Sequence, residues 1–287
     1  MYGSSDVVAR KVTVPELRAR KAHGPSIAMV TAYDFTMARL LDEAGVDAVL
    51  VGDSLGMVVQ GLSNTLPVTL DEVCYHGRAV ARALRRAHLV GDMPFMTFEI
   101  SPDQAVANAG KMLKEGAFES VKVEGGQEIA DHVRRLVSVG VPVMGHVGLT
   151  PQRVHALGGF KVQGRTDEAA ERILADAVAL EQAGVYAIVL EAMPSELASD
   201  ITHAVSVPTI GIGAGRGCDG QVLVCTDLLG MSRGHTPKFV KRFAEVGDTI
   251  VSAVKSYVEQ TRTGVFPDTM QEYRSAPAEI GVRVTGS

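Results

Sequence analysis

The chain has 287 residues, of which 46% are hydrophobic and 21% are charged, and its formal net charge is −5. These values lie within the globular range and exclude an intrinsically disordered chain. The lack of a basic excess disfavours a nucleic-acid partner, because such partners need cations to neutralise phosphates. The length suits either two domains or one α/β barrel, which typically needs about 250 residues.

The cysteines and the N-terminal segment point to a reducing compartment. The three cysteines form no CxxC pair, and their odd number rules out a full disulfide framework, so we expect free thiols. The N-terminal segment carries charges throughout and has no apolar stretch of the signal-peptide type. No segment approaches the roughly 18 apolar residues of a membrane span. We therefore expect a soluble, cytoplasmic protein without a membrane partner.

Eight short apolar runs recur along the chain, and helical stretches follow most of them. The runs are continuous rather than alternating, which suits strands of a parallel sheet buried on both faces. The predicted strands are 27–31, 48–52, 89–93, 120–124, 141–146, 187–191, 209–212 and 221–225. The predicted helices are 35–44, 70–87, 101–115, 127–139, 167–183, 195–205 and 238–261, after a short helix that begins at 13–16.

This order predicts a (β/α)8 TIM barrel with a short N-terminal helix before the first strand and a C-terminal extension. We expect residues 1–264 to form the single barrel domain and residues 265–287 to form the extension. The alternative is an open doubly wound sheet, but no G-x-G-x-x-G motif follows the first strand.

Acidic residues stand at the ends of several predicted strands, where barrels place their catalytic groups. Asp53, Asp92 and Glu124 stand at the ends of neighbouring predicted strands, so they would meet at one end of the barrel. Three carboxylates in one place repel one another, and partial burial also removes their hydration. A divalent cation removes that cost, and Mg²⁺ prefers such hard oxygen ligands. We predict that these three residues share one ion; the alternative is that each is a solvated acid capping the next helix.

Four further polar residues stand beside these carboxylates. Lys122 lies two residues before Glu124 and shares its face of the strand, so it either pairs with a substrate carboxylate or merely neutralises Glu124. Ser54 either helps to hold Asp53 or caps a helix. His146 is either a core histidine or a hydrogen-bonding group that carries protons. Glu191 stands across the ring, where a carboxylate in a partly apolar pocket suits a base or an acid.

Two loops carry weaker signals. The glycine-rich segment 211–221 follows the seventh predicted strand, where it forms either an anion-binding nest or, as we prefer, a tight turn beside a close neighbour. The segment 157–165 contains basic residues and reads as a mobile loop that could cover the mouth.

Long motifs in the same order resemble the ketopantoate hydroxymethyltransferase family, from about residue 11 to about residue 267. They include VGDSLGMVVQG (51–61), DMPF (92–95), VKVEGG (121–126), GHVGLTPQ (145–152) and GIGAGRGCDGQVLV (211–224). Phe160 stands where that family commonly has Tyr, and Met96 and Thr97 stand where small residues are common. These departures concern the loops on the donor side.

The resemblance implies a phosphoenolpyruvate/pyruvate-type barrel that moves a hydroxymethyl group from 5,10-methylenetetrahydrofolate to 3-methyl-2-oxobutanoate, giving 2-dehydropantoate (ketopantoate) for pantothenate and coenzyme A synthesis. It implies Mg²⁺, or a similar divalent cation, at Asp53, Asp92 and Glu124. It implies that the 2-oxoacid contacts Asp53, Ser54, Asp92 and Lys122, that Glu191 accepts a proton, and that the chains form a homo-oligomer, commonly a decamer. On that chemistry, His146 would position the substrate or assist.

Two other functions remain open from the sequence. One is a Mg²⁺-dependent C–C lyase of the same barrel superfamily, which would need a catalytic cysteine in a gating loop. The other is a non-catalytic barrel that serves as an assembly scaffold.

Overall fold

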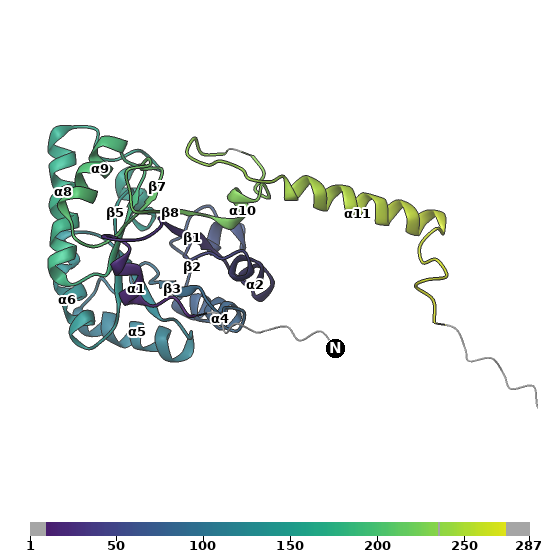
Figure 1. The fold of residues 1–287 in the computed structure, drawn as a ribbon, viewed down its shortest axis with the longest axis horizontal. Helices are drawn as coiled ribbons and strands as arrows, with labels where there is room; N and C mark the ends of the chain where they lie inside the picture. Colours follow the sequence, from purple (N-terminus) through teal and green to yellow (C-terminus); the bar gives the residue numbers. More distant parts are fainter. Residues whose placement is uncertain (1–9, 235, 274–287) are drawn as a thin grey trace, which may run out of the picture.

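Eight parallel strands close into a barrel in which neighbours in the sequence are neighbours in space, and β8 pairs with β1 (Figure 1). The structure is a computed structural model and describes residues 10–234 and 236–273. The strands are β1 Ile27–Thr31, β2 Ala48–Val51, β3 His88–Asp92, β4 Ser120–Glu124, β5 Val143–Gly148, β6 Ala187–Glu191, β7 Thr209–Ile212 and β8 Gly220–Leu223. The predicted barrel class is therefore confirmed.

Most predicted strand bounds agree with the structure to within one or two residues. The largest difference is at β5, which begins at Val143 rather than at residue 141. The reason is Pro142, which has no N–H to donate to a neighbouring strand.

Most helices of the chain cover the outside of the barrel, and the last one extends away from it. The longer ones are α1 Val14–Ala19, α2 Phe35–Glu43, α4 Leu70–Ala81, α5 Pro102–Glu115, α6 Ala130–Ser138, α8 Asp167–Ala183, α9 Ser195–Ala204 and α11 Val246–Thr263. Single turns form α3 Leu55–Val58, η1 Gln127–Ile129, η2 Pro151–Arg153, α7 Val154–Leu157 and α10 Cys225–Leu228. The predicted capping box of α4 is present, since Thr69 and Glu72 bond each other's backbone N–H groups.

Two predicted helices are longer than the observed ones. The helix predicted over 70–87 ends at Ala81, because the Asp42 carboxylate binds the backbone N–H groups of the following segment, Arg85 to Ala87, and draws the chain toward β3. The helix predicted over 238–261 begins only at Val246. Before it, the Phe243 N–H donates to Leu228 O at 2.9 Å, so this stretch bonds back to α10 instead of forming a helix.

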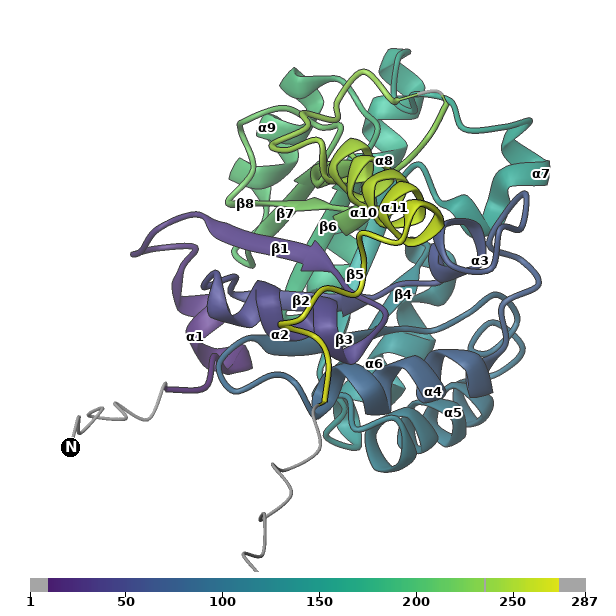
Figure 2. The ribbon, with the colours of Figure 1, turned by 90° about the vertical axis from the view of Figure 1, so that its right-hand side faces the viewer.

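One connection departs from a regular alternation of strands and helices. β7 and β8 are joined directly by residues 213–219, without a helix between them. The last helix, α11, extends away from the barrel in Figure 1 and is seen nearly end-on in Figure 2. Its apolar side chains are consequently exposed; for example, Ile250 is 46% exposed, Val254 is 54% exposed and Tyr257 is 55% exposed. The predicted boundary at residue 264 stays a prediction, and residues 274–287 of the predicted extension lie outside the described residues.

The core has two parts, because successive strand residues point to opposite sides of the barrel wall. Side chains such as Met29, Leu50 and Val90 fill the interior of the barrel. Their neighbours, such as Val30 and Val49, pack outward against the helices. Among the described residues, no helix is both long and apolar enough to cross a membrane.

A buried polar chain lies inside the barrel, at the end opposite the carboxyl ends, and joins residues of β3 and β4 to the residue before β6. His88 Nε2 lies 2.9 Å from Ser120 Oγ, which lies 2.9 Å from the hydroxyl of Tyr186. Burial lowers the pKa of His88 to about 4. The folded protein therefore holds this imidazole neutral under conditions in which the unfolded chain protonates it.

This histidine makes the stability depend on pH. Because its folded pKa lies below the unfolded value of about 6.5, the unfolded chain binds a proton first as the pH falls, and up to about 3 kcal/mol of stability is lost between about pH 6.5 and pH 4. We expect His88→Gln to remove this part of the loss, as measured by urea unfolding across the range. Parallel curves for the two proteins would contradict the assignment.

Candidate active site

The carboxyl ends of the strands bring all seven predicted site residues into one small cavity. Its volume is about 170 Å³, and its lining includes Asp53, Ser54, Asp92, Lys122, Glu124, His146 and Glu191. Asp92, Glu124 and Glu191 are the last residues of β3, β4 and β6, and Asp53 follows β2 by two residues. We call this space the inner cavity.

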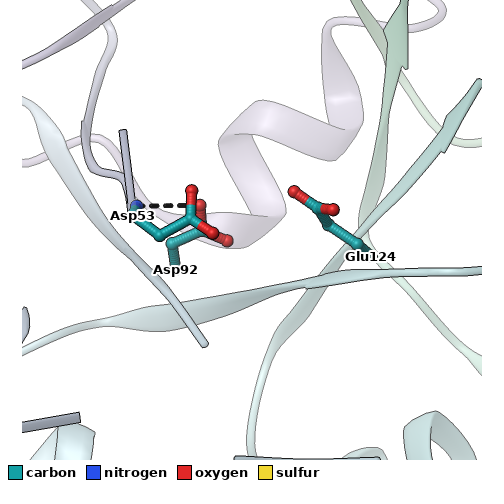
Figure 3. Close-up of side chains that lie close together, drawn as sticks. All are labelled: Asp53, Asp92 and Glu124. Carbon is teal, nitrogen blue, oxygen red and sulfur yellow. Dashed lines mark hydrogen bonds between the residues drawn. The ribbon is translucent and has the colours of Figure 1, made fainter. Parts of the chain in front are cut away.

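Three of its carboxylates come close together and are almost completely buried. Asp53, Asp92 and Glu124 each offer one oxygen that lies within 4.8 Å of the others. Figure 3 shows the three side chains converging, with the Asp53 N–H donating to Asp92 Oδ2 at 3.2 Å. A buried oxygen, Glu124 Oε1, makes no hydrogen bond. Converging oxygens with spare lone pairs are what a hard divalent cation requires.

The protonation of these acids reflects how much charge is crowded into the cavity. Burial, together with Asp92 and Glu124, raises the pKa of Asp53 well above its usual range. Burial also raises the pKa of Asp92, although Lys122 opposes the shift. For Glu124, burial acts in the same direction but is outweighed by Lys122 and His146, so its pKa is lowered. Burial and the crowding of carboxylates therefore make the charged forms of Asp53 and Asp92 costly in the absence of a further cation.

Lys122 is the cation at the centre of this group. Its Nζ lies 2.7 Å from Asp92 Oδ1 and 3.5 Å from Glu124 Oε1. Burial lowers the pKa of Lys122, but Asp92, Glu124 and Asp53 more than offset it, and the net shift is upward. Lys122 is therefore charged, and it does contact Glu124, as one of the two sequence interpretations expected.

His146 links the acidic group to the far side of the barrel. Its Nδ1 lies 3.4 Å from Glu124 Oε1, and its Nε2 lies 3.2 Å from Glu191 Oε2. Burial and Lys122 lower the pKa of His146, but Glu124 and Glu191 outweigh them and raise it to about 9. His146 is thus a buried histidine that faces the cavity, rather than one that belongs to the apolar core.

The Ser54 side chain forms a hydrogen bond neither with Asp53 nor with the helix terminus, the two partners that the sequence suggested. Its hydroxyl lies 2.8 Å from the Tyr33 hydroxyl and makes no capping bond to α3, whose N-cap position it occupies. The side chain still lines the inner cavity.

Sequence reasoning missed Gln152, which joins two of the carboxylates. Its Nε2 donates to Asp53 Oδ2 at 3.0 Å and to Met93 O at 2.9 Å, and its backbone N–H donates to Glu124 Oε2 at 3.0 Å. Gln152 lies in η2, four residues beyond β5, so it does not stand at a strand end. Its only signal was its place in the motif GHVGLTPQ.

The glycine-rich segment 211–221 packs tightly, as preferred above. Gly213 and Gly215 have φ values of +64° and +80°, and a Cβ at these positions would lie 2.9 Å from Phe239 and 2.6 Å from Ser195. Both neighbours would have to shift if a side chain were added.

The contacts of Gln152 predict a measurable cost for its removal. Gln152→Leu leaves the buried Asp53 carboxyl without its side-chain donor, so we expect the free energy of unfolding in urea to fall by about 1–3 kcal/mol. The matched control is Gln60→Leu, which removes an exposed amide–carboxylate bond to Glu72 and should change stability by less than about 0.5 kcal/mol. Equal effects of the two changes would count against the role of Gln152.

Comparisons with known proteins bear on this site. The ketopantoate hydroxymethyltransferase family model matches residues 11–269. A 3-methyl-2-oxobutanoate hydroxymethyltransferase of Anaeromyxobacter sp. (strain Fw109-5) is 57% identical over 94% of this chain and 90% of its own length. The protein of that name from Syntrophus aciditrophicus is 52% identical over 92% of this chain and 97% of its own.

Solved structures with low sequence identity share the barrel. Phosphonopyruvate hydrolase matches with a TM-score of 0.60 at 12% identity, over 92% of both chains. 2,3-Dimethylmalate lyase, a member of the PEP mutase/isocitrate lyase superfamily, matches with a TM-score of 0.57 at 14% identity, over 91% of both chains. These likenesses concern the fold alone. The family match and the curated relatives show that the chain belongs to the ketopantoate hydroxymethyltransferase family, a family of transferases that act in pantothenate synthesis.

Proposed function

We propose that the chain moves a hydroxymethyl group from 5,10-methylenetetrahydrofolate to C3 of 3-methyl-2-oxobutanoate and forms 2-dehydropantoate. The observation that carries the proposal is the buried triad of Asp53, Asp92 and Glu124 in a cavity of about 170 Å³ beside a buried lysine. This volume lies below the ~300–1,000 Å³ of sites for drug-sized ligands, so it suits a small acid. Family membership supports the reaction.

The triad fits a divalent cation such as Mg²⁺. Its oxygens converge, Glu124 Oε1 has no hydrogen bond, and burial makes uncompensated carboxylates costly. When bound there, the ion would supply Lewis acidity that stabilises negative charge on the keto oxygen by several kcal/mol.

Lys122 and Ser54 border the space left for the 2-oxoacid. A charged lysine at the wall of a buried cavity favours an anionic substrate, and its ammonium would pair with the carboxylate of the acid. Asp53 and Asp92, which lie beside them, would contact the same molecule. These contacts fix the acid and leave its C3 free to react.

On this proposal, Glu191 removes the C3 proton. Both nitrogens of His146 already have neighbours: Nε2 faces Glu191, and Nδ1 lies 3.3 Å from Lys122 Nζ and 3.4 Å from Glu124 Oε1. Neither of them is therefore free to accept a proton from the substrate. Glu191 lines the inner cavity and also a larger neighbouring one, so its carboxylate faces the space where two reactants would meet. His146 then positions the Glu191 carboxylate. The carbanion formed at C3 attacks the methylene carbon of the donor as one of its two C–N bonds breaks and that nitrogen takes up a proton. Water then replaces the other C–N bond, which leaves the hydroxymethyl group on C3 and releases tetrahydrofolate.

Proton removal can be measured without the donor. We expect the enzyme with Mg²⁺ to exchange the C3 proton of 3-methyl-2-oxobutanoate with deuterium from solvent, followed by NMR, and Glu191→Gln to slow the exchange by about 10²–10⁴-fold, as for loss of a general base. Glu196→Gln, in the first turn of α9, is the control and should keep the rate. Undiminished exchange in Glu191→Gln would remove this residue from the role.

The C–C lyase alternative would need a catalytic cysteine beside the inner cavity. None of the three cysteines lines the inner cavity. Cys74 and Cys225 are buried, and burial raises the pKa of both thiols, which leaves them as unreactive thiols.

We further propose that copies of this chain associate through α11, in keeping with the decamer that the family resemblance implies. Ile250, Val254 and Tyr257 recur at helical spacing on one stripe of a helix that extends beyond the barrel, and all are about half exposed. Such an apolar stripe is stable in water only when another surface covers it. Along the outside of β7 and β8, the barrel itself lacks a covering helix at the 213–219 connection, and a second copy supplies one.

This association is sensitive to charge on the stripe. We expect Val254→Glu to reduce the mass measured by sedimentation equilibrium to that of smaller species, because a carboxylate would be buried at the contact. Ser252→Glu places the same charge on the opposite side of α11 and should leave the assembly intact. An unchanged mass for Val254→Glu, or a monomeric parent protein, would contradict the proposal.

A further inference from the structure

A second and much larger cavity opens directly beside the inner one. It has a volume of about 1260 Å³ and shares Met57, Phe160 and Glu191 with the lining of the inner cavity. We call it the outer cavity. The proposed base therefore stands at the junction of the two spaces, and a molecule in the outer cavity reaches the reacting carbon there.

The outer cavity gathers apolar side chains from loops that are far apart in the sequence. Met57 (37% exposed), Phe160 (50%), Val162 (41%) and Phe239 (41%) all line it. Exposed apolar residues of this size are normally scattered over a surface, and their convergence in one cavity marks a binding site. Two of the four are phenylalanines, whose rings suit a flat heteroaromatic ligand.

The charges of the outer cavity have the opposite sign to those of the inner one. Lys161, Arg216 and Lys238 line the outer cavity and do not line the inner cavity. The only acid in its lining is Glu191, at the junction. Among the described residues, none of the three cations takes part in an ion pair, so an anionic group on a ligand is their natural partner.

These three cations sit on different loops at the same end of the barrel. Lys161 follows α7, Arg216 lies in the 213–219 connection, and Lys238 follows α10. The cavity also continues along the outside of β8 to Gln221, where the proposed contact between copies would lie. A ligand that reaches from the junction to the three cations occupies the part of the cavity away from Gln221.

We propose that the outer cavity binds the reduced folate donor, with its pterin at the junction beside Phe160 and Glu191 and its glutamate carboxylates on Arg216, Lys238 and Lys161. The proposal rests on the proposed function and adds to it where the donor lies. The inner cavity is too small for such a molecule, and the outer one exceeds the ~300–1,000 Å³ of typical ligand sites. The apolar walls would contact the uncharged part of the donor. The cations would favour donors whose glutamate tail carries more carboxylates.

The test compares donors that differ only in that tail. The KM for 5,10-methylenetetrahydropteroate, which has no glutamate, is measured against the KM values for the monoglutamate and triglutamate folates, with saturating Mg²⁺ and keto acid. We expect the KM of the parent enzyme to be highest for the pteroate donor, lower for the monoglutamate and lowest for the triglutamate, because the number of carboxylates rises in that order. An exposed charge pair is worth about two- to fivefold in affinity, so Arg216→Gln/Lys238→Gln should raise the KM for the glutamylated donors by on the order of tenfold.

The same double variant should barely change the KM for the pteroate donor, so that the preference for glutamylated donors collapses. Arg135→Gln, on α6 outside the barrel, removes an exposed arginine far from the cavity and should keep the preference. Phe160→Ser should raise the KM for all three donors together, because it removes apolar contact rather than charge.

Equal KM values for the three donors in the parent enzyme, or a preference in the double variant as large as in the parent, would overturn this assignment. A parent enzyme that transfers no one-carbon group from any of the donors would instead refute the proposed function. The two failures are thus distinguished by whether the parent enzyme transfers the one-carbon group at all.

Discussion

The other groups of this site depend on one constraint, which is the burial of three carboxylates close together at one end of the barrel. Asp53, Asp92 and Glu124 are each at most 4% exposed, and like charges in so dry a space repel strongly. The protein offsets part of this cost with Lys122, whose ammonium lies 2.7 Å from Asp92. Burial and the remaining repulsion raise the pKa values of Asp53 and Asp92, and a divalent cation bound there would offset both costs.

The polar residues around the triad all serve to hold it in place. Gln152 bridges Asp53 and Glu124, and His146 joins Glu124 to Glu191. A fixed set of ligands lowers the cost of organising the site when a substrate binds. On our proposals, the charge then changes sign across the junction: the inner cavity holds the small acid beside the carboxylates, and the outer cavity faces the tail of the larger donor with cations.

The fold and the inner cavity were largely predictable, because both follow from patterns along single strands. Continuous apolar runs located the eight strands, and the charged residue at each strand end identified Asp92 and Glu124. Gln152 escaped because it lies beyond the strand end and acts through tertiary hydrogen bonds. The late start of α11 and the early end of α4 were also beyond sequence patterns, since backbone bonds to α10 and to Asp42 decide them.

The central claim is that burial of the triad is tolerated because a cation binds it, and thermal unfolding with and without Mg²⁺ and 3-methyl-2-oxobutanoate tests this most directly. For the parent protein, ligands at about 100 times their dissociation constants should add roughly 2.7 kcal/mol of stability. Asp53→Asn removes one repelling charge, so it should be at least as stable as the parent without ligands, yet lose the response to Mg²⁺. An Asp53→Asn protein that Mg²⁺ stabilises as much as the parent, or a parent that does not respond at all, would contradict the claim.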